Sequence, residues 1–355
     1  MGKPSNRQEQ IVAALRQRGT ARVAELADEF GVSFVTMRRD VEALARGGRV
    51  ARSHGVVRLL PTSGNAAPAS LTGTVTMIAP GRSAYFAEIV RGAQIAAEEQ
   101  GLTWNFMACE EDESAGAALD RSAGAADALG TLLSPRWRLP VDVDAEDTAW
   151  QPLPAPAQRP AVLVERFAPR GSALATIDAV RTDHAHGVWL ALRHLHARGH
   201  RRILLAARDD SPTARTIRSA FVTSLADMGL PRIAAPLLSS AGAGRSPDAP
   251  VPHLPEAVRT AGATAVLAHS DVDAVNLVQQ LHGAGLRVPA DVSVVAYDDV
   301  IAGMDGLELT TVAPPKREIG RTAVALLRER LERPGPTRHV ELLPVLRDRG
   351  STESI

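Results

Sequence analysis

Apolar residues in the N-terminal part of the chain recur every three or four positions, which is the period of an amphipathic helix. The pattern predicts helices over about 6–18, 22–30 and 34–46, with Gly31 turning the chain between the second and the third. Ser33 precedes the third helix, where its hydroxyl can accept hydrogen bonds from the free amides of the first turn. The third helix should turn three apolar side chains inward, namely Met37, Val41 and Leu44.

Two short runs with the alternation of β-strands come next, at 49–52 and 56–60. They flank residues 53–55, which join them into a hairpin that forms a wing. Helices followed by such a wing predict a winged helix-turn-helix domain over residues 1–60.

Beyond residue 73, short apolar runs alternate with segments of helical period. The apolar runs predict strands at 74–79, 203–207, 265–268 and 292–297, and the helical periods predict helices at about 84–100, 187–198, 214–228 and 272–282. This alternation predicts an α/β fold with parallel sheets. Residues 61–70 have no periodicity and read as a flexible tether. We therefore expect a head at 1–60, a linker at 61–72 and a body at 73–355, since 355 residues exceed one core.

The zero net charge of the chain conceals an asymmetry between these parts. Residues 1–60 carry eleven Lys or Arg and six Asp or Glu, a net charge of +5, and the remainder carries −5. A basic head on an acidic body indicates a polyanionic partner for the head alone. The sequence has no long apolar run and no signal-peptide pattern, and its one cysteine, Cys109, fits a reducing cytoplasm.

The third predicted helix carries chemistry suited to DNA. A helix in the major groove presents its N-terminal residues to base edges, while arginines contact phosphates or guanine. Ser33 and Thr36 can reach bases or phosphates, and Arg38 and Arg39 fall near the outward face. A helical bundle whose arginines are merely solvated is the alternative.

The run VAELADEFGVSFVTMRRDVEALARGGRVARSHGVV resembles the winged helix-turn-helix of DeoR-type regulators. The resemblance covers about residues 6–58 and includes the Gly-Val-Ser turn, the Arg-Arg-Asp segment and the Arg-Ser-His-Gly wing. It implies a DNA-binding face made of Ser33, Phe34, Thr36, Arg38, Arg39, Arg52 and His54, with Val35 beside them.

Ligands of parallel α/β sheets bind at the carboxyl ends of the strands. The predicted strand ends carry polar or aromatic residues in four segments, at 80–86, 208–210, 269–271 and 298–299. Carboxylates, an arginine and aromatic rings together are typical of pockets for sugars or nucleobases. Taken one by one, the aspartates could instead cap helices, and the aromatic residues could belong to the core.

Several segments of the body, among them DHAHGVWLALRHLHARGHRRILL and LRVPADVSVVAYDD, resemble the ligand domain of LacI/GalR-type regulators, which has the periplasmic-binding-protein fold. The resemblance implies two lobes joined by three crossovers, lobe 1 at about 73–197 and 312–335, and lobe 2 at about 198–311 and 336–351. It implies a ligand cleft lined by Tyr85, Phe86, Ser270 and Asp298, with Arg215 and Arg218 nearest to the place of an expected arginine.

Together these patterns predict a cytoplasmic transcriptional repressor. We expect the head to bind operator DNA as a homodimer, and a small effector, a sugar or a derivative, to close the lobes. The histidines between 184 and 200 lack metal-site spacing, and no phosphate-binding glycine motif follows a strand, so we expect no metal, cofactor or catalytic residue. Two alternatives remain: a sugar-phosphate isomerase-like enzyme body, and a regulator whose pocket no longer binds a ligand.

Overall fold

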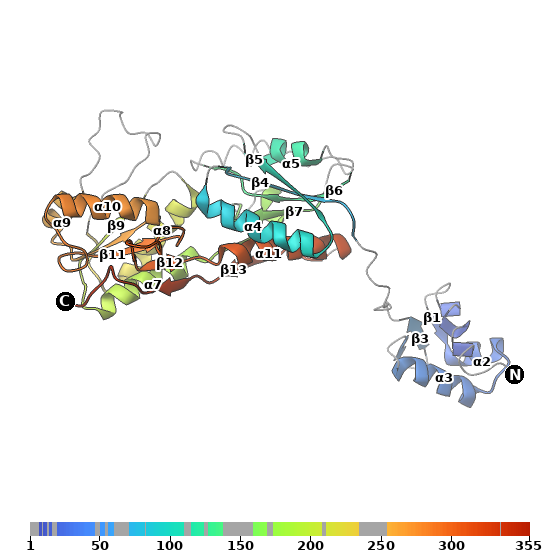
Figure 1. Ribbon diagram of the computed structural model, residues 1–355. Coiled ribbons are helices and arrows are strands. Elements are labelled where there is room, and N and C mark those ends of the chain that lie inside the picture. The colour runs from blue at the N-terminus through green and yellow to red at the C-terminus, as the bar shows by residue number, and fades with distance from the viewer. Residues whose placement is uncertain are drawn as a thin grey trace. The chain divides into compact units, whose positions relative to one another are not determined.

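The computed structural model divides the chain into two compact units, Met1–Leu71 and Thr72–Ile355 (Figure 1). Each unit buries a hydrophobic core of its own. The structure describes residues 7–8, 10–12, 14–15, 20–46, 50–53, 56–59, 71–81, 83–109, 115–123, 127–137, 159–168, 173–207, 211–233, 254–333 and 335–355. The head is now taken as the first unit, and the second unit is called the sensor; residues 61–70 of the predicted linker lie outside the described residues.

The head is a winged helix-turn-helix, as the sequence predicts. Its described helical residues are those between 7 and 15, α2 (Val23–Glu29) and α3 (Phe34–Arg46). The antiparallel sheet has the order β1 (Thr20–Arg22), β3 (Val56–Leu59), β2 (Val50–Ser53). The strand β1 has only three residues, too few for a period-two pattern, and sequence reasoning missed it.

The first lobe of the sensor is built on a six-stranded parallel sheet with the order β13-β8-β7-β6-β4-β5. The strands are β4 (Thr74–Ala79), β5 (Thr103–Ala108), β6 (Ala128–Leu133), β7 (Ala161–Val164), β8 (Asp178–Thr182) and β13 (His339–Leu342). The helices α4 (Ala84–Glu99) and α11 (Lys316–Glu332) cover one face, and α5 (Ala115–Ala123) lies on the other (Figure 1). The short 3-10 helix η2 spans Ala173–Thr176.

The second lobe has a five-stranded sheet with the order β14-β12-β11-β10-β9, in which only β14 runs antiparallel. The strands are β9 (Ile203–Ala206), β10 (Ala265–Ala268), β11 (Ser293–Tyr297), β12 (Thr311–Ala313) and β14 (Val345–Arg347). The helices α7 (His184–Ala197) and α8 (Pro212–Asp227) share a core on one face, and α9 (Leu254–Ala261) and α10 (Asp271–Gly283) share a core on the other.

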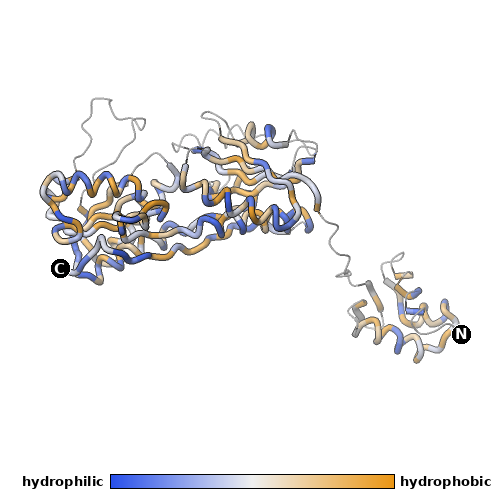
Figure 2. Tube along the Cα trace, viewed as in Figure 1, coloured by the Kyte–Doolittle hydropathy of each residue, from blue (hydrophilic) through white to orange (hydrophobic). Residues whose placement is uncertain are grey.

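The four parallel strands of the second lobe are buried on both faces, which explains their continuous apolar runs (Figure 2). Successive residues of β9 show the arrangement, since Ile203 and Leu205 join one core and Leu204 and Ala206 join the other. The α/β fold class predicted from the alternation of strands and helices is therefore confirmed.

The chain crosses between the lobes three times, but not where the sequence placed the boundaries. We expected the first lobe to continue to 197, whereas the inner residues of α7, Val188 and Leu192, pack on the second sheet. The first crossover therefore follows β8, at Asp183. Likewise β12 pairs within the second sheet and β13 within the first, so the boundaries expected at 312 and 336 fall after these strands. Core contacts decide a lobe boundary, and they are not local in sequence.

The first lobe depends on a close approach of α4 and α11. A Cβ atom at Gly92 would lie 2.1 Å from the carbonyl oxygen of Arg317, and one at Gly320 would lie 2.2 Å from that of Ile89. Only glycine permits this contact, because the neighbouring atoms belong to backbone and cannot move aside.

Candidate functional site

Ser33 caps the helix α3, as the sequence predicts. Its Oγ accepts a hydrogen bond from the amide of Thr36 at 3.2 Å, and the two hydroxyl oxygens lie 2.8 Å apart. Further along the helix, Met37 and Val41 are completely buried in the head core. This packing fixes which face of α3 turns inward and leaves the opposite face to solvent.

The solvent face of α3 carries most of the predicted DNA contacts. Phe34 is 52% exposed and Val35 75% exposed, and Arg38 and Arg39 are exposed as well. Arg38 pairs with Glu42 at 3.0 Å, but both side chains are largely in water, where such a pair contributes little to stability. A DNA phosphate can therefore compete for this arginine.

The other predicted contacts lie on the wing. Arg52 belongs to β2, but its side chain and the whole of His54 lie outside the described residues.

On α3, the acid that follows Arg39 has a structural role. Asp40 is buried, and its carboxylate accepts a hydrogen bond from Arg7 at 2.6 Å, which ties the first helix to α3.

In the sensor, a buried carboxylate gathers donors at the carboxyl edge of the first sheet. Glu165 directly follows β7, and its Oε1 accepts from the hydroxyls of Tyr85 at 2.9 Å and Thr182 at 2.8 Å. Ser83 places Tyr85 by capping α4, since its Oγ accepts from the amide of Phe86 at 3.4 Å. Glu165 adopts a φ of +55°, a conformation unusual for a residue other than glycine.

The second lobe joins this cluster through His184, the first residue of α7. Its Nε2 lies 3.4 Å from Oε2 of Glu165, and its Nδ1 lies 3.1 Å from the hydroxyl of Tyr297 at the end of β11. Tyr85, Glu165, Thr182, His184 and Tyr297 thus form one network between the lobes, which we call the interlobe network. Sequence reasoning selected only Tyr85 among them.

Burial and hydrogen bonding oppose each other in the interlobe network. Burial alone would raise the pKa of Glu165, but the imidazole of His184, 3.4 Å away, and the hydroxyls of Thr182 and Tyr85 outweigh it and lower that pKa. Burial and nearby carboxylates raise the pKa of both Tyr85 and Tyr297 well above the usual range. The network therefore holds one carboxylate and two neutral phenols.

Asp298 follows Tyr297 and lies beside the interlobe network. Burial, and next the charge of Asp271, raise the pKa of Asp298 to about 7. Lys316, at the start of α11, donates to the backbone carbonyls of Asp298 and Asp299 and lies 5.8 Å from the ring centre of Tyr85. An amine of the first lobe thus contacts backbone of the second.

Two residues at the start of α10 support the second lobe. Ser270, with a φ of +74°, caps α10 by accepting from the amide of Asp273 at 3.1 Å. Asp271 accepts from the three successive amides of 300–302 at 2.6, 2.6 and 2.9 Å, which fixes the loop after Asp299.

Three arginines lie near the carboxyl ends of strands in the two lobes. Arg166 is buried, donates to the carbonyls of Pro135 and Glu165 at 2.7 Å each, and lies 5.5 Å from the ring centre of Phe86. Burial lowers the pKa of Arg166 to about 10. Arg215 reaches from α8 to the carbonyl of Trp137 in the first lobe at 3.1 Å, whereas Arg218 donates to Ala207 of its own lobe at 3.0 Å. The candidate segment 208–210 lies outside the described residues.

Two protein families match this chain. A DeoR-like helix-turn-helix domain matches residues 7–62, and a periplasmic binding protein-like domain matches residues 192–352. The chain is 27% identical to the HTH-type transcriptional repressor CytR of Escherichia coli over 331 residues, which cover 90% of this chain and 92% of CytR. The chain is a LacI/GalR-type transcriptional regulator with a DeoR-type head. The resemblances identified from the sequence are thereby confirmed.

Solved structures share the fold of this LacI/GalR-type regulator. A LacI family transcriptional regulator from Enterococcus faecium with bound ribose matches with a TM-score of 0.62 and 22% identity, over 79% of this chain and 99% of that one. The Lac repressor dimer bound to operator and the anti-inducer ONPF matches with a TM-score of 0.63 and 22% identity, over 80% and 94% of the two chains. Among the described residues, no helix is long and apolar enough to cross a membrane.

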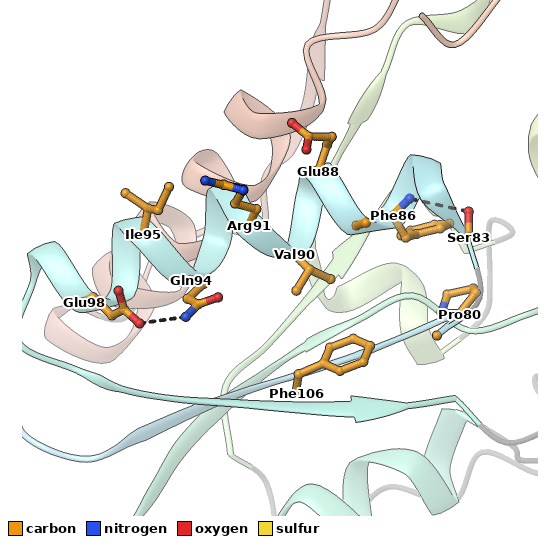
Figure 3. Close-up of a pocket in the computed structure, with 12 residues that line it drawn as sticks. Pro80, Ser83, Phe86, Glu88, Val90, Arg91, Gln94, Ile95, Glu98 and Phe106 are labelled. Atoms are coloured by element: carbon orange, nitrogen blue, oxygen red, sulfur yellow. Dashed lines mark hydrogen bonds between the residues drawn. The ribbon is translucent and has the colours of Figure 1, made fainter. Parts of the chain in front are cut away.

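The sensor of this LacI/GalR-type regulator also carries a surface groove of about 550 Å³ along α4 and β5. Figure 3 shows Val90 of the helix and Phe106 of the strand pointing toward one another across it. Phe106 is 39% exposed, and β5 is an edge strand of its sheet. An apolar side chain exposed on an edge strand can take part in binding another chain.

Proposed function

We propose that this regulator acts in the cytoplasm as a repressor, without catalysing a reaction. Its head binds operator DNA as part of a homodimer, and a sugar or sugar derivative between the lobes controls that binding. The observation that carries the proposal is the interlobe network, in which Glu165 and Thr182 of one lobe meet His184 and Tyr297 of the other. A ligand that binds there better in one lobe arrangement shifts the regulator toward that arrangement.

The chemistry around the interlobe network supports a polyhydroxylated ligand. Carboxylates such as Asp298 accept from sugar hydroxyls, arginines such as Arg215 donate to them, and the ring of Phe86 can pack against an apolar sugar face. The Enterococcus faecium relative in fold has ribose bound. We propose Tyr85, Phe86, Arg215, Arg218, Ser270 and Asp298 as ligand contacts.

The groove along α4 and β5 supports the homodimer. Winged and related helix-turn-helix regulators read two half-sites with two heads, so a dimer interface outside the head is expected. A second copy of the chain would cover Phe106 and Val90, and the Lac repressor, similar in fold, was solved as a dimer. Phe106→Asp should therefore turn a dimer into a monomer in sedimentation experiments, whereas Val222→Asp, at an exposed site on α8, should leave the dimer intact.

Thermal unfolding of the full chain with a panel of sugars and nucleosides, ribose first, tests the ligand. A ligand at one hundred times its Kd should stabilise the sensor by about 2.7 kcal/mol. The same ligand should change the affinity for a DNA site selected from a random library, and Asp298→Ala should abolish both effects. A panel without any shift would overturn the ligand proposal and favour a regulator whose pocket has lost binding.

A further inference from the structure

The helix α3 begins with two apolar side chains that the head does not bury. Phe34 and Val35 are the first residues of α3, and they are 52% and 75% exposed. They are the large apolar side chains that the described part of the head leaves exposed. The core beneath them is already closed by Met37 and Val41, which are completely buried.

Their neighbours are those of a DNA-reading surface. The hydroxyls of Ser33 and Thr36 flank the pair, and Arg38 and Arg39 follow on the exposed side of the same helix. Hydroxyls and arginines can contact phosphates and base edges. Apolar side chains contribute nothing to phosphate binding, so Phe34 and Val35 require a different explanation.

The major groove offers one apolar group, the C5 methyl of thymine. In helix-turn-helix proteins the N-terminal residues of the recognition helix approach the base edges, and Phe34 and Val35 occupy that position. We propose that Val35 and Phe34 of this regulator bind thymine methyl groups, so that its operator half-site contains thymine at the bases facing the start of α3. This inference rests on the proposed operator binding.

Replacement of thymine by deoxyuridine tests the proposal, because it removes the methyl group and leaves base pairing unchanged. The full-length protein first selects its site from a random DNA library. Each thymine of that site is then replaced in turn, and the dissociation constants are measured at one salt concentration. One or two replacements per half-site should weaken binding about fourfold, which corresponds to about 0.8 kcal/mol for one buried methyl-sized group.

Variants assign the effect to the two side chains. In Val35→Ala or Phe34→Ala the penalty of the matching deoxyuridine should fall to less than twofold, since the contact is already lost. Both residues are exposed, so the substitutions should leave the melting temperature unchanged. Val222→Ala, the same truncation at an exposed site on α8, should keep the full fourfold penalty.

The outcomes separate this inference from the function on which it rests. Failure to select any sequence would contradict operator binding itself. A selected site that tolerates deoxyuridine at every position, or an equal penalty in wild type and Val35→Ala, would overturn the methyl contact alone. A change of oligomeric state in Phe34→Ala, with DNA affinity unchanged, would assign the pair to a contact between proteins instead.

Discussion

The candidate binding residues of the head are exposed on α3, whereas those of the interlobe network in the sensor are largely buried. On α3, Phe34, Val35 and Arg39 lie in water, and the fold does not need their side chains. In the interlobe network, Glu165 and His184 are buried and hydrogen-bonded to other candidates. The head thus presents a surface ready for a partner, whereas the sensor encloses groups that also hold its lobes together.

This difference predicts how each unit responds to substitution. Exposed contact residues can be removed with loss of binding and little loss of stability. Buried polar groups cannot be removed without leaving a partner unsatisfied, so binding and stability should change together in the sensor. The same coupling allows a ligand to act on the lobe arrangement, because the groups that it would contact are those that join the lobes.

The largest effect should come from Gly92→Ala, which tests whether the two units unfold separately. The new methyl group would meet the backbone of Arg317 and force α4 away from α11. We expect the sensor to lose about 3 kcal/mol, or roughly 6–12 °C in Tm, while the head transition stays in place. Differential scanning calorimetry of the full chain measures both transitions.

Gly283→Ala is the matched control, because a Cβ atom there would meet nothing within 4 Å. It should leave the sensor transition unchanged or slightly higher. If Gly92→Ala lowered the head transition as much as that of the sensor, the division into independent cores would be wrong.

The next largest effect should come from the double substitution Arg38→Ala and Arg39→Ala. In the proposed homodimer the double substitution removes four phosphate contacts, two per head, which should weaken DNA binding about 100-fold or more and reduce the slope of log K against log salt by about 3.6. Both arginines are exposed, so the Tm of the head should not change. Fluorescence anisotropy across a salt series measures the slope, and Arg232→Ala, at an exposed site of the sensor, should leave it unaltered.

The sequence predicted the fold class and part of the element order, because the patterns that it carries are local. Strands buried on both faces give continuous apolar runs, so the strand 74–79 was placed with the bounds that β4 has. Two of the missed elements lack such patterns, since β5 is an exposed edge strand and α5 is rich in alanine, whereas β7 does have an apolar run and could have been predicted from it. The lobe that contains α7 depends on its contacts with the second sheet, which no local pattern encodes.

The candidate site was only partly predictable for the same reason. Ser33 was identified because capping is local, and Tyr85 because it follows an apolar strand. Glu165 was missed, although it follows the apolar run 161–164 and the same rule would have selected it. His184 was interpreted as one of several scattered histidines, since its partners Glu165 and Tyr297 come from distant parts of the chain.

A smaller effect, of opposite sign, is expected from Asp298→Asn. Its folded pKa is raised to about 7, so the native state favours the protonated form. The native state is therefore most stable, as far as Asp298 is concerned, below the unfolded pKa near 4, where the carboxyl is protonated. This stability is lost as pH rises to about 7 and the carboxyl must ionise. Asparagine removes the dependence and, like aspartate, tolerates the φ of +96° at this position. A three-unit shift alone would amount to about 4 kcal/mol, but Asp298 is partly exposed and solvent screens its charge, so the variant should be more stable than wild type by roughly 1–2 kcal/mol at pH 8.

The pH series supplies the control for this prediction. Wild type and Asp298→Asn should have nearly equal stability at pH 4, and the gap should widen up to about pH 7 and then remain constant. Ligand-induced stabilisation should meanwhile weaken in the variant, in keeping with the trade-off between function and stability. A gap that is the same at pH 4 and pH 8 would show that burial of the Asp298 charge is not its cause.

The smallest expected effect on stability comes from the substitution of a capping serine by alanine, made once in each unit. Ser33→Ala removes the cap of α3 and should cost the head about 1 kcal/mol. Ser83→Ala removes the equivalent cap of α4, but that hydrogen bond is longer, at 3.4 Å, and α4 is also anchored by its contact with α11. One kcal/mol shifts Tm by roughly 4–8 °C in a small domain and about half as much in a large one. Ser33→Ala should therefore lower the head transition by several degrees and Ser83→Ala the sensor transition by less. Equal shifts in the two Tm values would mean that the capping serine stabilises the head no more than its counterpart stabilises the sensor.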